Sequence, residues 1–243
     1  MTKEFSYTSY RELLRAFKGA GYEFVDFPSF ALSESDSRSR VLLRHDIDFD
    51  LEAAAKMAEI EFEEEVQSTY FFLLRTKFYN LFLRDSGVLL DRIRGYGHRI
   101  GLHFDRGEYP ESMTRQELAG ECRREARVLS EIVGEDVNVV SYHRPDEDEK
   151  TGNPETSFPL LNTYMAAFTK DILYRSDSRG CWRYGHPLES EAFQNRLPMQ
   201  ILIHPIWWRS APLEPLEVLH ELIEKRKVEV ETEVARNCTI YRR

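Results

Sequence analysis

The stretch Arg40-Val41-Leu42-Leu43-Arg44-His45-Asp46-Ile47-Asp48 joins an apolar run, long enough for one buried strand, to an abrupt cluster of charged side chains. Because side chains alternate along a strand, Arg44, Asp46 and Asp48 are expected on one face, with His45 on the other. Two carboxylates on one side of a strand end repel each other, and a cation, a metal or a shared proton usually relieves such a pair. The stretch therefore predicts either a polar strand end that passes into a loop or one wall of a functional site.

The overall composition is typical of a soluble globular protein, with 42% hydrophobic and 31% charged residues. A chain of 243 residues is long enough for one large α/β domain. We expect one domain over residues 1–243, with residues 1–39 as an extension containing a helix and a short strand. The net charge of −9 argues against a nucleic-acid partner, which needs basic surface. No window predicts a membrane span and the start lacks a signal peptide, so we expect a cytoplasmic protein.

Helix and strand patterns alternate along almost the whole chain. Helices are predicted at residues 8–19, 51–66, 79–93, 114–133 and 215–236, and strands at 22–27, 40–48, 68–74, 99–104, 137–142, 172–176 and 198–203. In the second helix, Phe62 is expected on the apolar side and most of Glu61 to Glu65 on a solvated face. Residues 146–168 show no clear period, which is typical of a long functional loop. The alternation predicts a parallel sheet with helices outside it.

Polar side chains follow several of these strands at the point where each one ends. They are Asp46 and Asp48, His103 and Asp105, His143 and Arg144, Asp177, and His204. Such clusters favour a barrel, in which the strand ends converge on one site. A lone histidine at a strand end is more often a hydrogen-bonding residue than a ligand. Three histidines beside two aspartates instead favour a metal-assisted hydrolase, since these ligands suit a divalent cation such as zinc.

The order of these segments resembles the NodB-homology polysaccharide deacetylases, carbohydrate esterase family 4, from about Arg40 to Pro205. RHDID resembles a variant of the family's TFDDG motif in which the second Asp moves one residue on. GHRIGLHFD resembles GHEIGNHTxxH, with His103 at the first motif histidine. SYHRPD stands where the family has RxPY, SDSRGCW resembles the segment with its Asp and Trp, and ILIHP resembles the strand that ends in the catalytic histidine.

The resemblance implies a distorted (β/α) barrel of about seven parallel strands. It also implies a metal-dependent hydrolase that removes an N-acetyl group from an amino sugar of a polysaccharide or its precursor. The implied cofactor is one divalent metal ion, with zinc as the first choice and cobalt, nickel or manganese as alternatives. The implied partner is a carbohydrate substrate.

The family's roles carry over to specific residues of this chain. Asp48 and His103 would hold the metal, Asp46 would act as general base, and His204 as general acid oriented by Asp177. The family's second motif histidine falls at Gly107, so a third ligand must come from elsewhere.

The resemblance leaves open which residue is the third metal ligand and what role Arg144 has. His143, at the position of the motif arginine, is the first choice for the third ligand, and Asp105 is the second. Arg144 is displaced by one residue from that arginine, and is expected to pair with Asp46 or to bind substrate.

Residues outside these motifs are candidates for substrate binding. Trp182, Trp207 and Trp208 are expected near the mouth, either as sugar-stacking walls or packed on helix tops. Arg75, at another strand end, would bind an anionic group of the substrate or pair with Asp46 or Asp48.

Two other functions remain open on the sequence. One is hydrolysis of another carbon–nitrogen bond, such as a formamide or ureide, because the same metal chemistry serves any amide. The other is a non-catalytic carbohydrate-binding relative with a decayed site, for which Gly107 is the main argument. The joint presence of Asp46, Asp48, His103 and His204 argues against decay.

Overall fold

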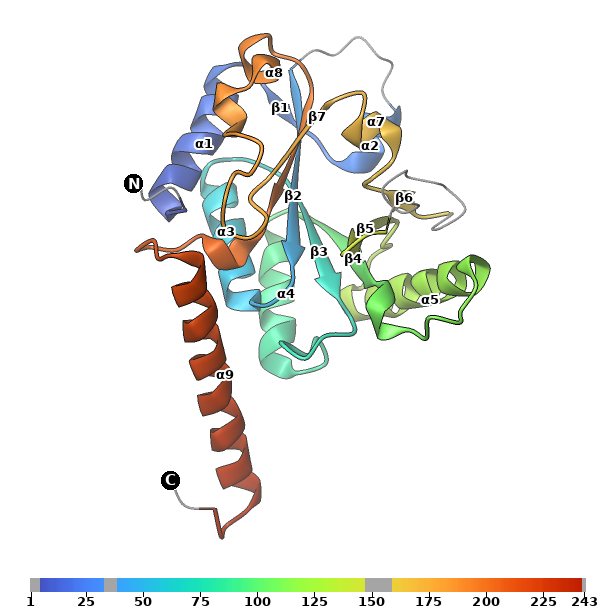
Figure 1. Cartoon of the computed structure of the whole chain (residues 1–243), viewed down its shortest axis with the longest axis vertical. Helices are drawn as coiled ribbons and strands as arrows, with labels where there is room; N and C mark the ends of the chain where they lie inside the picture. Colours follow the sequence, from blue (N-terminus) through green and yellow to red (C-terminus); the bar gives the residue numbers. More distant parts are fainter. Residues whose placement is uncertain (1–4, 33–38, 147–158, 242–243) are drawn as a thin grey trace.

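A single parallel sheet organises the chain in the computed structural model, which describes residues 5–32, 39–146 and 159–241. The strands run in the order β6-β5-β4-β3-β2-β8-β7, and β1 pairs with the start of β2 (Figure 1). Their bounds are β1 (Glu23–Phe24), β2 (Arg40–Ile47), β3 (Thr69–Leu73), β4 (Arg99–Asp105), β5 (Val139–His143), β6 (Leu161–Asn162), β7 (Leu173–Ser176) and β8 (Met199–Ile203). Every pairing is parallel.

The strands curl into a half-barrel, which confirms the predicted distorted (β/α) barrel of about seven parallel strands. Within the described ranges no pairing joins β6 to β7, so the barrel is open between them. The helices are α1 (Tyr7–Gly19), α2 (Phe27–Leu32), α3 (Leu51–Glu63), α4 (Arg84–Gly95), α5 (Arg115–Val133), α7 (Ala166–Thr169), α8 (Glu191–Gln194) and α9 (Pro215–Asn237). Short 3-10 turns are η1 (Arg106–Glu108), η3 (Pro187–Glu189) and η4 (Pro205–Trp207).

Two predicted elements differ from the structure for local reasons. The helix predicted from residue 79 begins only at Arg84, because the Asn80 side chain accepts the Phe82 N–H at 3.0 Å and holds a turn there. The strand predicted over 22–27 stops at Phe24, and Asp26 accepts the Ser29 N–H at the start of α2. The irregular stretch 146–168 contains β6 and the start of α7, while its residues 147–158 lie outside the described ranges.

The inside of the half-barrel is built in layers. An apolar floor lies at the bottom, made of Phe27, Leu42, Phe71, Val139 and Phe168. Gly101 makes room for it, since a Cβ there would lie 2.4 Å from the Phe71 ring. Above the floor, β2 turns the side chains of Arg44 and Asp46 inward, so charged groups are buried directly beneath the open end of the strands.

The outer face of β2 carries a second buried polar cluster, centred on Glu61 of α3. Glu61 is fully buried and accepts hydrogen bonds from His45 at 2.5 Å, Ser68 at 2.6 Å and Tyr70 at 3.0 Å, and one from Tyr10. Glu61 is thus an exception within an acidic run predicted to be mostly solvated, because these donors satisfy its carboxylate inside the core. Burial alone would raise the pKa of Glu61, but the charge and hydrogen bond of His45 outweigh it and lower the pKa to about 2.

The rotation of α3 also corrects the position expected for Phe62. Its side chain is 54% exposed and stacks on Tyr96, with ring centroids 4.8 Å apart. Glu63 and Glu65 remain on the exposed surface as expected. Because Glu61 faces inward, its neighbour Phe62 lies on the outer side of α3.

Replacing Glu61 by Gln should destabilise the fold by about 3–5 kcal/mol, the usual cost of removing one partner from a buried charged pair. Urea unfolding measures this loss. The control is Glu63→Gln on the same helix, whose surface ion pair with Arg11 should contribute at most about 1 kcal/mol. The difference between wild type and Glu61→Gln should shrink as the pH falls from 4.5 towards 2, because the unfolded state takes up the proton first. Equal losses for both variants would contradict a stabilising role for the cluster.

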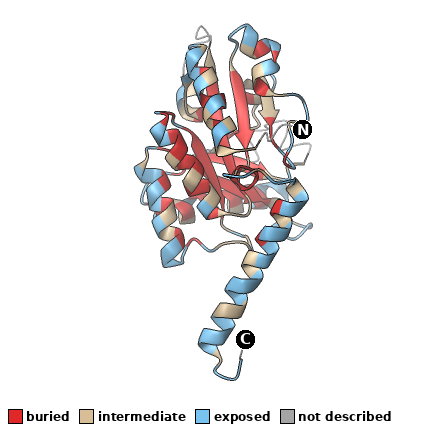
Figure 2. Cartoon of the chain, turned by 90° about the vertical axis from the view of Figure 1, so that its left-hand side faces the viewer, coloured by how far each residue is buried: buried red, intermediate tan, exposed pale blue. Residues whose placement is uncertain are grey.

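Helix α9 extends away from the body of the molecule (Figure 1), and its far half is mostly exposed (Figure 2). Only Val218 and Leu222 of this helix are buried. Of the helices in the described part of the chain, none combines the length and apolar character that a bilayer crossing requires. The start of α9 lies beside the open end of the half-barrel, where Pro215 and Leu219 line a cavity.

Candidate functional site

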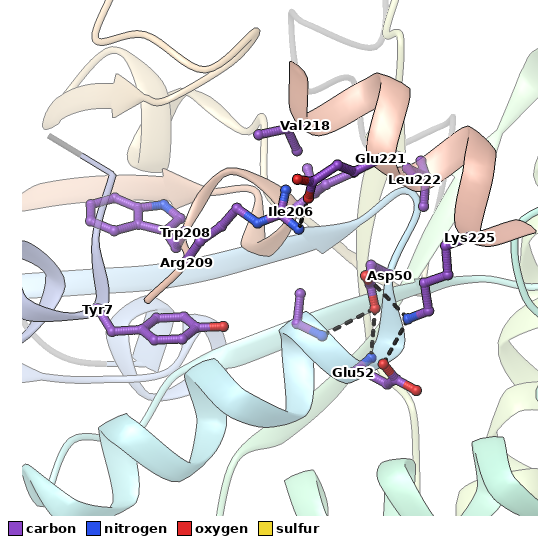
Figure 3. Close-up of a pocket in the computed structure, with 11 residues that line it drawn as sticks. Tyr7, Asp50, Glu52, Ile206, Trp208, Arg209, Val218, Glu221, Leu222 and Lys225 are labelled. Atoms are coloured by element: carbon purple, nitrogen blue, oxygen red, sulfur yellow. Dashed lines mark hydrogen bonds and ion pairs between the residues drawn. The ribbon is translucent and has the colours of Figure 1, made fainter. Parts of the chain in front are cut away.

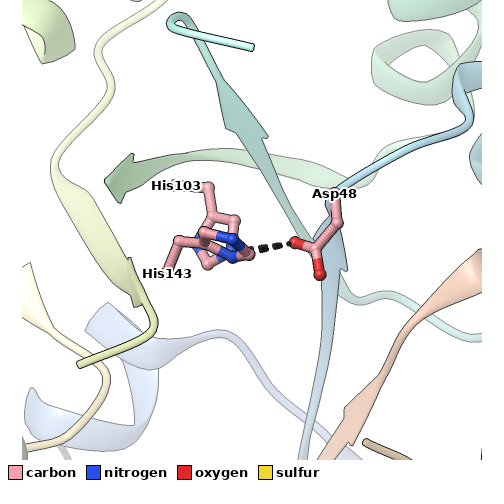
Figure 4. Close-up of side chains that lie close together, drawn as sticks. All are labelled: Asp48, His103 and His143. Carbon is pink, nitrogen blue, oxygen red and sulfur yellow. Dashed lines mark hydrogen bonds and ion pairs between the residues drawn. The ribbon is translucent and has the colours of Figure 1, made fainter. Parts of the chain in front are cut away.

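Asp48, His103 and His143 meet at the open end of the half-barrel (Figure 4). Asp48 follows β2 by one residue, His103 lies near the end of β4, and His143 is the last residue of β5. One ligand-type atom from each residue lies within 4.8 Å of the others. Asp48 Oδ1 is 3.1 Å from His103 Nε2 and 3.4 Å from His143 Nδ1. The structure thus brings together the three residues that the sequence favours as metal ligands.

These separations fit a divalent metal ion. Ligand atoms about 2.0–2.2 Å from a tetrahedral metal lie roughly 3.3–3.6 Å apart, close to the observed distances. A set of two imidazoles and one carboxylate is typical of zinc sites that keep a position for water. Burial alone would raise the pKa of Asp48, but hydrogen bonds from His103 and His143 lower it strongly, so the carboxylate is ionised as a metal ligand must be.

The surroundings of the two imidazoles orient them for this role. His103 Nδ1 donates to the backbone oxygen of Ser141 at 3.1 Å, which leaves Nε2 to face Asp48. His143 Nε2 lies 3.9 Å from Asp105 Oδ2, behind the cluster. Asp105, the alternative third ligand, is outside the group of three and instead accepts the Gly107 N–H at 2.8 Å. Asp105 is therefore near His143 without a hydrogen bond to its ring.

Arg144 also lies away from its first expected partner. It pairs with Asp105 at 2.5 Å, not with Asp46. Gly107 leaves room for the pair, because a Cβ at that position would lie 3.1 Å from Asp105 Oδ1 and 3.2 Å from Arg144 Nη2. The position at which the family has its second histidine is therefore filled by an ion pair.

Asp46 is held by a buried arginine from its own strand. Arg44 Nη2 and Nε contact the two carboxylate oxygens at 2.7 and 2.9 Å, and Ser141 Oγ donates to them at 3.1 and 3.2 Å. Arg44 also donates to Thr163, Gln200 and Tyr164. Burial would raise the pKa of Asp46, but the Arg44 charge outweighs it and lowers the pKa to about 2.

Sequence reasoning assigned no role to Arg44, although strand alternation placed it on the face of Asp46. The available signal was the spacing itself, because an arginine two residues before a buried aspartate on a strand is adjacent to it on the same face. Asp46 remains close to the cluster, with Oδ2 at 3.7 Å from His103 Nε2. Arg44 gives this carboxylate two N–H donors and Ser141 one shared O–H, which are three hydrogens for about four lone-pair sites, so one site is left to accept a proton.

His204 completes the site from the opposite side. Its Nδ1 donates to Asp177 Oδ1 at 2.7 Å, and its Nε2 lies 4.0 Å from Asp48 Oδ2. Asp177 is fully buried and also accepts from Trp208 Nε1 at 2.8 Å. Burial would lower the pKa of His204, but the hydrogen bond and charge of Asp177 outweigh it and raise the pKa to about 9. The imidazole is therefore protonated near neutral pH.

A cavity of about 770 Å³ opens above these groups. Asp46, Asp48, His103, His143 and His204 line it, together with Trp207 and several tyrosines. Trp182 is not among its lining residues, and packs against Phe5 and Trp208 with ring centroids 6.0 and 6.3 Å apart.

Arg75 is also placed away from the cavity. Its guanidinium pairs with Glu125 at 2.8 Å and lies over the Tyr109 ring. It contacts neither Asp46 nor Asp48 in the structure, because Glu125 of α5 offers a nearer carboxylate.

A smaller cavity of about 330 Å³ lies between the start of α3 and α9 (Figure 3). Lys225 pairs there with Glu52 at 2.7 Å, and Arg209 with Glu221 at 2.8 Å. These charges neutralise one another, and Asp50 caps α3. Nothing in this arrangement matches the ligand set of the larger cavity.

Comparison with known proteins identifies similar folds only among solved structures. No family model and no curated protein matches the sequence. A deacetylase from Streptococcus pyogenes in complex with acetate aligns at 13% identity over 88% of this chain and 85% of that one, with a TM-score of 0.47. The chitin deacetylase of Colletotrichum lindemuthianum aligns at 14% identity over 78% and 83%, with a TM-score of 0.45.

A family 4 carbohydrate esterase pseudoenzyme from Bacillus anthracis aligns at 15% identity over 78% of this chain, with a TM-score of 0.39. This chain spans 60% of the length of that pseudoenzyme and 62% of two of its mutants.

Proposed function

We propose that this protein is a metal-dependent hydrolase that removes an N-acetyl group from an amino sugar of a polysaccharide or its precursor. The supporting observation is the arrangement around Asp48, His103 and His143, with an ionised carboxylate on one side and a protonated imidazole on the other. Amide hydrolysis needs a base for water and an acid for the leaving nitrogen, and Asp46 and His204 are suitably charged for these roles.

The residues of the chain divide the reaction between them. Asp48, His103 and His143 would hold one divalent cation, which polarises the acyl carbonyl and lowers the pKa of water when bound. Asp46, oriented by Arg44, accepts the proton of the attacking water. His204, oriented by Asp177, gives its Nε2 proton to the leaving nitrogen. The products are acetate and a free amino sugar.

Hydrolysis assays on metal-depleted and reloaded protein test this function. Protein treated with a chelator should release no acetate from N-acetylated sugars, and one equivalent of zinc, cobalt, nickel or manganese should restore release. Formate or ammonia from formamido or ureido substrates, without acetate, would favour the other carbon–nitrogen hydrolases. Metal binding without any product would favour a non-catalytic carbohydrate-binding protein. Less than roughly a tenth of one metal ion per chain after supplementation would contradict the metal mechanism.

Replacing His204 by Ala should keep the metal and lower kcat on the order of 10²–10⁴-fold, the usual contribution of a general acid. The control is His220→Ala, which removes an exposed imidazole from α9 and should change neither property. Metal content and kcat are measured on the same preparations. A His204→Ala variant with wild-type kcat would contradict the acid role.

A further inference from the structure

Two arginines on the wall of the large cavity lack an acidic partner. Arg179 and Arg183 line the cavity, and in the described part of the chain neither forms an ion pair. The other ionised groups there are paired, Asp46 with Arg44, Asp48 with the two imidazoles, and His204 with Asp177. Arg144 is paired with Asp105. Within the described ranges, the cavity wall therefore has two exposed arginines without a carboxylate partner, which are available to an anionic ligand.

Backbone hydrogen bonds and one close contact define the course of the loop after β7, which carries these arginines. The Gly180 N–H donates to Asp177 O at 2.9 Å, and the Arg183 N–H donates to Cys181 O at 2.9 Å, so two tight turns follow each other. Gly180, with φ of +69°, packs directly on α9, since a Cβ there would lie 2.6 Å from Pro215 Cγ. The backbone that carries the arginines is thus supported by turns and by α9, so binding has to order mainly their side chains.

The order of the strands suggests how a substrate would lie in the cavity, from the three candidate metal ligands towards this loop. Asp48, His103 and His143 come from β2, β4 and β5, whereas His204 follows β8, which lies next to β7. The acyl group would lie at the first three residues and the leaving nitrogen at His204 Nε2. The remainder of the sugar then extends across β8 and β7, where Arg179 and Arg183 are located.

From this placement we infer that the substrate is an anionic acetamido sugar, whose phosphate or carboxylate group is bound by Arg179 and Arg183. The guanidinium fork matches both oxyanions, with two parallel hydrogen bonds. Exposed aromatic surface at Tyr184, whose ring lies 5.8 Å from the Arg183 guanidinium, adds a face for the sugar ring. The inference rests on the proposed function for the orientation of the substrate.

Equilibrium binding tests the inference without any turnover. Isothermal titration of the chelator-treated protein, which should release no acetate, compares N-acetylglucosamine 1-phosphate, N-acetylmuramic acid and neutral N-acetylglucosamine. We expect at least one of the two anionic sugars to bind about tenfold or more tightly than the neutral one, the difference that one charge-assisted contact supplies. Arg179→Ala and Arg183→Ala should each remove much of that difference and leave the neutral sugar unchanged.

The matched control is Arg127→Ala, which removes an exposed arginine from α5, outside the cavity. It should alter none of the three affinities. Equal affinities for all three sugars, no binding of either anionic sugar at millimolar concentration, or wild-type discrimination in both loop variants would each overturn the inference. Arginine-dependent binding, with no acetate release from any sugar by the metal-reloaded protein, would refute the proposed function alone.

Two sources of a glycosyl phosphate are separated by further ligands. A nucleoside diphosphate sugar and a sugar phosphate with a short prenyl chain both present the same phosphate to the arginines. Tighter binding of the first would indicate a nucleotide-linked precursor, and tighter binding of the second a lipid-linked one. If both bind more weakly than the neutral sugar, the substrate is not a glycosyl phosphate.

Discussion

Replacing Asp48 by Asn should abolish both metal binding and hydrolysis. The carboxylate is the one negatively charged member of the cluster, and it contacts both imidazoles at 3.1 and 3.4 Å. An amide keeps the shape of the side chain and loses its charge. Metal affinity should therefore fall by more than roughly a hundredfold, which is the largest loss usual for substitution of a residue that only contacts a ligand. Metal content after dialysis and acetate release measure the two losses.

The chain offers a matched control two residues further on. Asp50→Asn makes the same chemical change at the N-cap of α3, where Asn caps as well as Asp. It should keep full metal content and activity. An Asp48→Asn variant that retains stoichiometric metal would contradict the proposed ligand set.

The same measurement decides between the two candidates for the third ligand. His143→Ala should lose the metal as Asp48→Asn does. Asp105→Asn removes a charge 3.9 Å from the imidazole and should weaken binding by at most about 10–100-fold, the range for residues next to the ligands. The reverse order of effects would make Asp105 the ligand.

Replacing Asp46 by Asn should leave the metal bound and lower kcat on the order of 10²–10⁴-fold, the contribution typical of general acid–base catalysis. Asn has no basic oxygen to accept the proton of water. It also leaves the buried Arg44 without a negative charge, so the variant should be less stable by about 3–5 kcal/mol. Assays at reduced temperature, normalised to bound metal, separate the catalytic loss from unfolding.

Ser141→Ala provides the comparison for this variant. It removes a hydroxyl that donates to both Asp46 oxygens but leaves the Arg44–Asp46 ion pair intact. We expect metal binding and most of kcat to be retained. Similar kcat losses in Ser141→Ala and Asp46→Asn would indicate that packing around the carboxylate, and not its basicity, limits the reaction.

The sequence predicts the order of strands and helices because its periodicities are strong and local. The ends of elements are less predictable, since Asn80 and Asp26 hold turns through single side-chain hydrogen bonds that periodicity does not register. Glu61 shows the same limit within a helix. Its burial depends on Tyr10, His45 and Tyr70, which only the tertiary fold brings to it.

The candidate site divides in a similar way. The sequence predicts which strand ends supply Asp48, His103 and His143, because parallel strands place their carboxyl ends together. It does not predict the pairing of charges. Arg144 was expected beside Asp46, but Arg44 binds Asp46 and Arg144 binds Asp105. Which guanidinium reaches which carboxylate depends on the three-dimensional structure.

The opposite faces of β2 have a consequence for folding. Arg44 and Asp46 neutralise each other inside the half-barrel, and Glu61 is hydrogen-bonded to His45 outside it. A shift of β2 by one residue against β3 and β8 would turn His45 inward and leave Glu61 facing a new neighbour. Each unpaired buried charge would cost several kcal/mol. Asp46, proposed as the general base, therefore also disfavours a shifted register of β2. A substitution at Asp46 should increase misfolding as well as slow hydrolysis.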